Sequence, residues 1–453
     1  MANYTFRERI KSAAIKPVLR MIDENPEKNI PRILNWLEAF DRNKTIQNQV
    51  TEVRRAMEEQ GHWYQLALSL WSDINDDQRK LVFHNFVING NVIANDRCAK
   101  TSEKYGCNVP WAILMDPTSA CNLKCRGCWA ADYGPGMNMS LETLDDIVQQ
   151  GKKLGVFVYL YSGGEPLVRK KDLITLCERH PDAMFLSFTN GTLIDDAFCR
   201  DLVRVKNFIP TISVEGFQKA TDARRGEGTF DKLSEAMDLL KHHKLGFGVS
   251  CCYTSENCEE VGSEAYFDWM VDKGAKFAWF FTYMPVGVNA IPELMVSAEQ
   301  RRFMFDKIRE YRKKKPIFTM DFWNDGEFVD GCIAGGRRYL HINANGDIEP
   351  CAFIHYADSN VYETRLLEAL QRPFFKAYQA GQPFNENMLR PCPLLDNKDE
   401  LARMVEQSGA KSTDLEHPED VRELCSKCHR AADAWAPLAD ELWSSYEHWV
   451  VKR

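Results

Sequence analysis

Six apolar runs of strand length, separated by stretches with helical spacing, constrain the fold of this chain most strongly. Strands that alternate with helices predict repeated βα units around a parallel sheet, which places the chain in the α/β class. Ser140 precedes the first of these helices as a candidate cap, and its inner face would carry Leu141, Leu144, Ile147 and Val148. The expected strands are Trp111–Met115, Val156–Tyr161, Met184–Thr189, Phe208–Val214, Phe247–Tyr253 and Phe277–Met284.

Residues 1–105 show only helical spacing and no motif with recognisable chemistry. Apolar residues recur at helical intervals from Ile30 to Phe40, again from Val50 to Met57, and from Leu66 to Trp71. We expect a packed helical region, with a docking surface for substrate or a partner as the alternative. An amphipathic start, Ile10 to Ile22, carries Arg9, Lys11, Lys16 and Arg20, which leaves contact with a membrane surface as a further alternative.

Charge and composition exclude several classes of protein. The net charge of −8 argues against nucleic acid as the main partner, because phosphate binding needs a basic surface. Met1 to Lys11 has no apolar core, so no secretory signal is expected there. The longest apolar stretch, Phe277 to Val288, is too short and interrupted to span a bilayer, so no transmembrane segment and a cytoplasmic location are expected.

Fifteen cysteines are distributed unevenly along the chain, and three of them fall within eight residues: Cys121, Cys125 and Cys128. They follow the first expected strand, so they lie on one loop at a strand end. Thiolates at these intervals can converge on one soft metal centre. A closed zinc or iron–sulfur site uses four protein ligands, so three leave one position open to another molecule.

Cys-x3-Cys-x2-Cys after a first strand resembles the radical S-adenosylmethionine (radical SAM) superfamily. The resemblance implies a partial (β/α)6 barrel over residues 106–315. It also implies a [4Fe–4S] cluster on Cys121, Cys125 and Cys128 whose fourth iron binds SAM; one electron then cleaves SAM to a 5′-deoxyadenosyl radical that abstracts hydrogen. One position departs from the family, which usually has an aromatic residue before the third cysteine. Here Gly127 stands there, and Trp129 follows the cysteine.

Further strand ends resemble the SAM-binding motifs of this superfamily. Gly163-Gly164-Glu165 matches its Gly-Gly-Glu motif, which implies contact with the amino group of SAM; paired glycines also let a backbone approach a ligand closely. Ser213-Val214-Glu215-Gly216 resembles its Ser-x-Asp-Gly segment with Glu in place of Asp, and implies that Ser213 lies near the carboxylate or ribose of SAM.

Less specific contacts follow from the same resemblance. Arg225 is expected to pair with the SAM carboxylate, while Arg224 is either a second candidate or a solvated loop cation. Ser250, together with Thr254 and Asn257, is a candidate contact to the ribose, and Tyr283–Gly287 a candidate wall for the adenine.

A second set of cysteines lies beyond Lys313-Lys314-Lys315-Pro316, where we expect a boundary to a domain of residues 316–453. Asn345-Gly346 predicts a hairpin, so a two-stranded ribbon should lie between the first two cysteines of the set. The third stands between two prolines, and the last two form a Cys-x2-Cys pair. The set is Cys332, Cys351, Cys392, Cys425 and Cys428.

This set resembles the C-terminal extension called SPASM or twitch, which holds auxiliary [4Fe–4S] clusters. Five cysteines suffice for one cluster, on Cys332, Cys351, Cys425 and Cys428, with Cys392 as contender for a ligand position. Zinc is the alternative metal for four cysteines. In peptide-oxidising relatives an Asp directly after a cluster cysteine can act as base, but Ala352 follows Cys351 here. Asp330 and Glu349 are the nearest acids, and no catalytic residue is assigned. The other cysteines are expected to be ordinary thiols.

Taken together, the resemblance predicts an enzyme that cleaves SAM reductively and takes hydrogen from a substrate, with the auxiliary cluster assisting. Its implied partners are an electron donor such as flavodoxin or ferredoxin and a peptide or protein substrate. No peptide-clasping winged-helix module is visible at the N-terminus, so a small molecule, sugar or lipid substrate remains the alternative. A non-catalytic iron–sulfur electron-transfer protein is the second alternative, and an open iron position argues against it.

Overall fold

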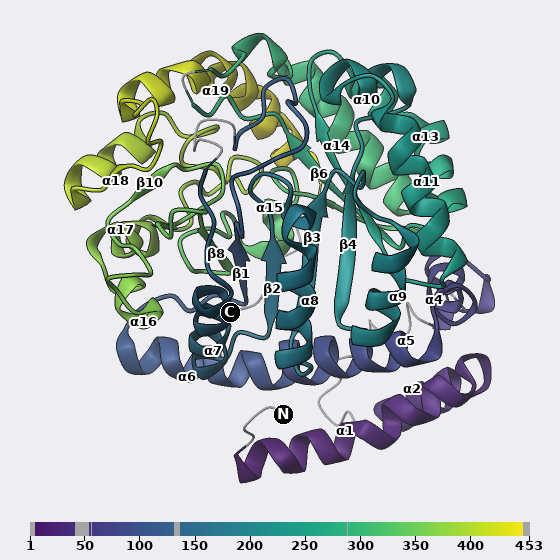
Figure 1. Cartoon of the computed structure of the whole chain (residues 1–453). Coiled ribbons are helices and arrows are strands. Elements are labelled where there is room, and N and C mark those ends of the chain that lie inside the picture. Colours follow the sequence, from purple (N-terminus) through teal and green to yellow (C-terminus); the bar gives the residue numbers. More distant parts are fainter. Residues whose placement is uncertain (1–4, 41–53, 56, 131–135, 288, 447–453) are drawn as a thin grey trace.

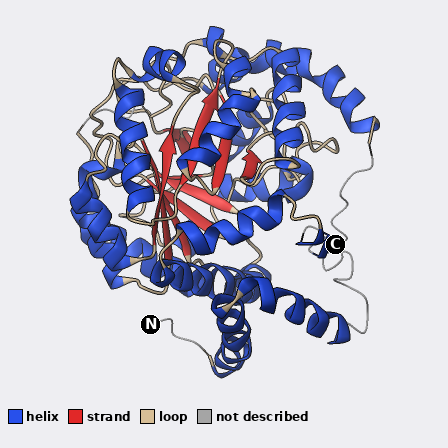
Figure 2. Ribbon diagram, turned by 90° about the vertical axis from the view of Figure 1, so that its right-hand side faces the viewer, coloured by secondary structure: helices blue, strands red, loops and turns tan. Residues whose placement is uncertain are grey.

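The computed structural model describes residues 5–40, 54–55, 57–130, 136–287 and 289–446. Its centre is one parallel sheet, and all six predicted strands are confirmed in sequence order. Adjacent strands in the chain are neighbours in the sheet, as βα units require. Figure 2 shows the strands inside and the helices outside. The strands are β1 (Ala112–Met115), β2 (Val158–Tyr161), β3 (Met184–Thr189), β4 (Phe208–Ser213), β5 (Gly248–Tyr253) and β6 (Phe277–Thr282).

Helices follow these strands and cover the outer face of the sheet (Figure 1). The first, α7, begins as predicted: the Ser140 hydroxyl accepts from the amide of Thr143, and Leu144, Ile147 and Val148 are buried against the sheet. The remaining helices of this part are η3 (Pro166–Arg169), α8 (Lys170–Arg179), α9 (Asp196–Val205), α10 (Gln218–Arg225), α11 (Thr229–His242), α12 (Cys258–Val261), α13 (Glu264–Lys273), η4 (Pro292–Leu294) and α14 (Ala298–Arg312), and α7 spans Leu141–Leu154.

Residues beyond 315 extend the same sheet at both ends. β7 (Phe318–Asp321) joins β6 in parallel, and β8 (Tyr339–Ile342) joins β1 in parallel. β9 (Ile348–Glu349) then pairs with β8 in the predicted antiparallel hairpin, whose turn holds Gly346 at φ +90°. The strand order is β7-β6-β5-β4-β3-β2-β1-β8-β9. The domain boundary at residue 315 stays a prediction. Strands from both sides of it are hydrogen-bonded in one sheet.

The rest of the C-terminal part packs beside β1 and β8 (Figure 1). It is mostly short helices and turns, ending in one long helix, α19, that carries the Cys425–Cys428 pair. Its elements are α15 (Gly326–Val329), β10 (Tyr356–Ala357), α16 (Leu366–Ala369), α17 (Pro373–Gly381), α18 (Glu400–Ser408), β11 (Lys411–Ser412) and α19 (Val421–Ser444).

The N-terminal helices close the end of the sheet where the strands begin, as the packed-helix prediction requires. The Gln78 side chain bonds Phe208 O at 3.4 Å and accepts from Gly246 N at 2.9 Å. Asn85 donates to Ala183 O at 3.1 Å, just before β3. These helices are α1 (Phe6–Glu24), α2 (Pro26–Phe40), α4 (His62–Asp73), α5 (Asp76–Phe83), η1 (His84–Ile93) and α6 (Ala94–Tyr105).

The alternatives for this region stay open. Arg9, Lys16 and Arg20 are exposed on α1, whereas the side chains of Ile10, Lys11 and Ile22 lie outside the described part of the structure, as do Val50 and Val53. Among the described helices, none combines the length and apolarity that crossing a bilayer requires.

Candidate active site and auxiliary cysteine pocket

The three-cysteine loop lies against the Gly-Gly-Glu segment that follows β2. The amide of Gly164 donates to Thr118 O at 3.0 Å, and the amide of Glu165 donates to Ala120 O at 2.9 Å. Two backbone segments from different strand ends are therefore held side by side directly before Cys121. The loop is positioned by main-chain hydrogen bonds, which do not depend on the side chains present.

The glycines of this segment permit that approach. A Cβ added to Gly163 would lie 2.6 Å from Thr118 O, and one added to Gly164 would lie 2.2 Å from Ala120 O. Both distances are too short for any side chain, and Gly163 also has φ +97°. The sequence predicted that the glycines admit a ligand. In the structure they admit the backbone that leads into the cysteine loop.

Glu165 is buried and already bonded. Its carboxylate accepts from Thr189 Oγ1 at 2.6 Å, Asn190 N at 2.7 Å and Leu167 N at 2.9 Å. Burial raises the pKa of Glu165, and these donors oppose that rise. The carboxylate ties the end of β2 to the Thr189-Asn190-Gly191 turn after β3.

Gly127 leaves room for an aromatic ring from another strand. A Cβ at this position would lie 2.7 Å from Tyr283 Cε2, and Gly127 adopts φ +67°. The Tyr283 hydroxyl accepts from Ile291 N at 2.9 Å, which fixes the ring from its far end. Tyr283, just after β6, therefore places its ring where the sequence lacked an aromatic residue, so part of the predicted Tyr283–Gly287 wall contacts the cysteine loop.

Glu215, after β4, binds both neighbouring arginines in a buried group. Its carboxylate lies 2.6 Å from Arg224 Nη1 and 2.7 Å from Arg225 Nη2. Burial works against the charge of Glu215, but the two guanidinium groups outweigh it and hold its pKa below the usual range. Arg224 is thus half-buried, with 13% of its side chain exposed, and paired, so its interpretation as a solvated loop cation is wrong.

This charge group also reaches the cysteine loop. Arg225 Nη1 lies 3.9 Å from Cys125 Sγ, and the amide of Arg126 donates to Arg224 O at 2.8 Å. Within the described residues, Arg225 Nε is buried without a hydrogen-bond partner. An arginine with a spare buried donor beside three thiols suits an anionic centre and an anionic ligand.

The remaining predicted contacts line the ends of β4 and β5. Ser213 and Ser250 are register partners in adjacent strands, so the two predicted SAM contacts lie side by side. Thr254 and Asn257 are close together but bond each other at 3.0 Å, and Asn257 also donates to Glu215 O at 3.1 Å. These two side chains shape the loop after β5, which leaves the serines as the better candidates for a polar ligand.

The three thiols fit a metal cluster by their chemistry and placement. Cys121 is exposed, whereas Cys125 and Cys128 are partly buried. Although Cys121 is exposed at the surface, the protein around its thiol partly desolvates it and raises its pKa to about 11, and burial raises the pKa of Cys128. Bound metal would supply the charge that keeps both as thiolates. In the described parts of the chain, no three Cys, His, Asp or Glu side chains are already grouped at metal-binding positions.

Three cysteines of the second set line one apolar pocket, formed by Cys332, Cys351 and Cys392 together with Phe322, Trp323 and Phe353 among others. Tyr339 donates its hydroxyl to Cys351 Sγ at 2.7 Å. Cys425 and Cys428 are buried on the first turns of α19. Cys392 shares its cavity with Cys332 and Cys351. This placement favours Cys392 as a cluster ligand over a thiol that binds no metal.

The acids considered as bases are engaged elsewhere. Asp330 lies 3.8 Å from Arg337 in an ion pair. Glu349 is buried, with Oε2 2.6 Å from His341 Nδ1. His341 Nε2 in turn lies 3.0 Å from Asp116, directly after β1. Burial alone would lower the pKa of His341, but the two carboxylates raise it to about 10.

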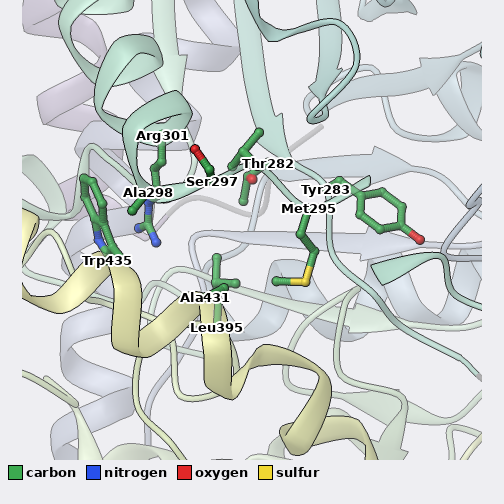
Figure 3. Close-up of a pocket in the computed structure, with 10 residues that line it drawn as sticks. Thr282, Tyr283, Met295, Ser297, Ala298, Arg301, Leu395, Ala431 and Trp435 are labelled. Carbon is green, nitrogen blue, oxygen red and sulfur yellow. The ribbon is translucent and has the colours of Figure 1, made fainter. Parts of the chain in front are cut away.

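A second, small pocket lies between the end of β6 and α19 (Figure 3). Arg301 crosses its wall beside Trp435, with the guanidinium 4.4 Å from the ring centre. Its donors are taken by Asn324, Asp396 and Leu389 O, at 2.9, 2.6 and 3.1 Å. The arginine joins the barrel to the segment after Cys392, and its bonds leave it little capacity for a ligand.

Comparison with known proteins relates part of the chain to a known family. Residues 115–261, from the end of β1 through the region after β5, match the model of the radical SAM superfamily. This stretch is therefore similar to a radical SAM domain. The predicted cofactors, SAM and [4Fe–4S] clusters, are those of this superfamily.

Curated relatives match the radical SAM domain and part of its surroundings. The chain is 32% identical to a serine-type anaerobic sulfatase-maturating enzyme of Klebsiella aerogenes, over 46% of this chain and 55% of that enzyme. It is 26% identical to the mycofactocin maturase MftC of Mycolicibacterium smegmatis, over 55% of this chain and 66% of that protein. The chain therefore spans only slightly more than half the length of the first of these relatives.

A solved structure agrees on the fold. SuiB of Streptococcus suis, in its complex with S-adenosylmethionine, superposes with a TM-score of 0.55 at 18% identity, covering 66% of this chain and 75% of that one. The predicted partial barrel is confirmed by this likeness and by the sheet itself.

Sequence reasoning noted Trp129 but missed its contacts with the C-terminal part, and it missed Asp116 and His341 altogether. Trp129, next to Cys128, contacts the rings of His341 at 5.7 Å, Phe353 at 5.8 Å and His355 at 6.0 Å. Asp116 carried a usable signal, because a carboxylate directly after a strand faces the mouth of a barrel. His341 carried none, since its position beside β1 depends on the pairing of β8.

Proposed function

We propose that this chain is a radical SAM enzyme whose first cluster is held by Cys121, Cys125 and Cys128. The observation that carries the proposal is the three-cysteine loop, fastened on one side to Gly163-Gly164 and on the other to Arg224 and Arg225. When bound, the cluster supplies one electron for the reductive cleavage of SAM. The open ligand position is consistent with this chemistry.

The chain's own residues hold and orient the ligands. Arg225, with a spare buried donor, binds the SAM carboxylate, and Glu215 fixes the direction of the guanidinium. The main chain of Gly163 and Gly164 receives the amino group, and Glu165 keeps that segment in place through its three donors. Ser213 and Ser250 offer hydroxyls to the ribose.

The second cysteine set binds an auxiliary [4Fe–4S] cluster that assists the oxidation of substrate. The shared cavity of Cys332, Cys351 and Cys392 supports this assignment, and one of Cys425 and Cys428 supplies the fourth ligand. Zinc stays the alternative metal. An electron donor such as flavodoxin or ferredoxin, and a cytoplasmic location low in oxygen, complete the proposal.

A peptide or protein substrate is supported by the names of the relatives. Two are a sulfatase-maturating enzyme and a maturase, and SuiB has been solved with the precursor peptide SuiA. The proposed reaction is hydrogen abstraction from a C–H bond of such a substrate, held between the two cysteine sets.

Anaerobic reconstitution with iron, sulfide, SAM and a reductant tests the proposal. We expect 5′-deoxyadenosine from the intact protein and none from Cys125→Ala, which should lose the first cluster and keep the second. Cys98→Ala removes a thiol outside both sets and should behave as the intact protein does. Absence of 5′-deoxyadenosine from fully iron-loaded intact protein would show that the chain is not such an enzyme.

A further inference from the structure

Side chains that face the inside of the barrel are less buried than those that face the surrounding helices. On β6, Phe277, Trp279 and Phe281 are partly exposed, whereas the alternate residues Ala278, Phe280 and Thr282 are buried. β3 and β5 show the same alternation. In a packed barrel the inward side chains fill the interior. Here the outward ones are the better buried, so the inward face has free space.

The partly exposed rings meet across this interior. Phe188 on β3 and Trp279 on β6 have ring centres 5.1 Å apart, although β4 and β5 lie between their strands in the sheet. Phe188 also contacts Phe281 at 5.8 Å. Rings from non-adjacent strands come this close only when both face inward, so they line the interior of the barrel.

This ring surface continues to both cysteine sets. Phe281 contacts Phe322 at 5.3 Å and Phe353 at 6.3 Å. Phe353 lines the cavity of Cys332, Cys351 and Cys392, and it contacts Trp129 beside Cys128. The wall between the two proposed clusters is therefore aromatic. We call Phe188, Trp279, Phe281, Phe322, Phe353 and Trp129 the ring wall.

Polar groups are concentrated on the other half of the barrel mouth. Ser213 ends β4 beside Ser250 of β5, and the Glu215–arginine group follows β4, where the proposed function places SAM. The histidine beside the ring wall is already paired: His341 lies 3.0 Å from Asp116 and 2.6 Å from Glu349. The ring wall thus offers apolar area to a ligand, and its neighbouring histidine is engaged with other side chains.

From this division we propose that the substrate group bearing the reactive C–H bond is apolar and uncharged, a hydrocarbon or aromatic group that packs on the ring wall. The inference rests on the proposed function and narrows its substrate class. An apolar substrate group differs from the serine and the cysteine that appear in the names of the sulfatase-maturating relatives. Such a group comes either from an apolar peptide side chain or from a free hydrocarbon-bearing molecule, and both present the same chemistry.

Binding of small probes to the reconstituted protein tests the proposal without turnover. With SAM bound and no reductant, calorimetry measures hexanol, octanol and decanol against glucose. Each methylene buried on the ring wall should tighten binding by about fourfold. The amides of N-acetylphenylalanine and N-acetylserine form a second arm, in which phenylalanine should bind at least about tenfold more tightly. Tighter binding of the phenylalanine amide than of decanol assigns the group to a peptide, and the reverse assigns it to a free hydrocarbon.

A matched pair of variants locates the binding. Phe281→Leu keeps the wall apolar and should retain decanol affinity within about threefold, whereas Phe281→Gln places a polar group there and should weaken it at least about tenfold. Phe188→Leu and Phe188→Gln form a second pair in case one site disturbs folding, and SAM affinity reports that each variant is folded. Leu415→Ser, at an exposed position, should change nothing.

Equal binding of glucose and decanol, or equal effects of Leu and Gln at both positions, would overturn the proposal. These binding results do not depend on SAM cleavage. A protein that binds decanol on the ring wall but forms no 5′-deoxyadenosine contradicts the proposed function alone, and one that cleaves SAM but prefers glucose contradicts the apolar substrate alone.

Discussion

The two cysteine regions of this protein differ in how exposed their thiols are and in how the chain brings those thiols together. The first places three thiols on one short loop, with Cys121 exposed and two half-buried arginines beside it. The second draws its thiols from distant segments: Cys332, Cys351 and Cys392 line one apolar cavity, and Cys425 and Cys428 are buried on α19. An exposed thiol and a spare guanidinium donor suit a centre that must admit a ligand. Burial on all sides suits one that only exchanges electrons or supports substrate.

Among variants that test this difference between the two regions, removal of Cys392 should have the largest effect. Because its thiol lines the cavity of Cys332 and Cys351, Cys392→Ala should lose the auxiliary cluster, so iron content falls by about half while SAM cleavage without substrate persists. Iron analysis and 5′-deoxyadenosine assays measure both. Cys199→Ala, a buried thiol outside both sets, is the control. Full iron in Cys392→Ala would leave Cys332, Cys351, Cys425 and Cys428 as the ligands.

Neutralising Glu215 should affect the first region alone. Glu215→Gln leaves two buried guanidinium groups without their carboxylate, which should cost about 3–5 kcal/mol of stability and abolish tight SAM binding. Chemical denaturation and equilibrium dialysis with SAM report the two losses. Glu256→Gln, which breaks an exposed ion pair with Arg126, is the matched control and should cost at most about 1 kcal/mol. Similar losses in both variants would contradict the role given to Glu215.

Filling the contact between the cysteine loop and Gly164 should have a smaller effect. Gly164→Ala forces the Ala120 carbonyl away, which should weaken SAM binding by about tenfold and leave the auxiliary cluster intact. Gly136→Ala has no atom within 4 Å of the new Cβ and serves as control. Unchanged SAM affinity in Gly164→Ala would mean that the loop is not positioned by this contact.

Removing one hydroxyl in the second region should have the smallest effect. Tyr339→Phe deletes the hydrogen bond to Cys351 Sγ, and we expect a loss of about 1 kcal/mol in stability with iron content unchanged. Loss of iron in this variant would show that the hydroxyl is needed for assembly of the auxiliary site. Tyr362→Phe, at an exposed position, provides the comparison.

Local patterns in the sequence predicted the elements that depend on local chemistry. The six strands, the Ser140 cap and the Asn345-Gly346 hairpin follow from spacing and turn residues. The pairing of β8 with β1 could not be predicted, because parallel partners distant in the chain leave no local signal. Arg224 was misjudged for the same reason: its burial depends on Glu215 and on the cysteine loop, which meet it only in the folded chain.

Because β8 is hydrogen-bonded to β1, the segments leading to Cys121 and Cys351 start from neighbouring strands of one sheet. The hydrogen-bonded pair of strands therefore sets the distance between the two cysteine sets. A chimaera that exchanged the C-terminal part between relatives would have to carry β8 with it. Cutting the chain at residue 315 would strip β1 of a partner and leave an unpaired strand edge prone to aggregation.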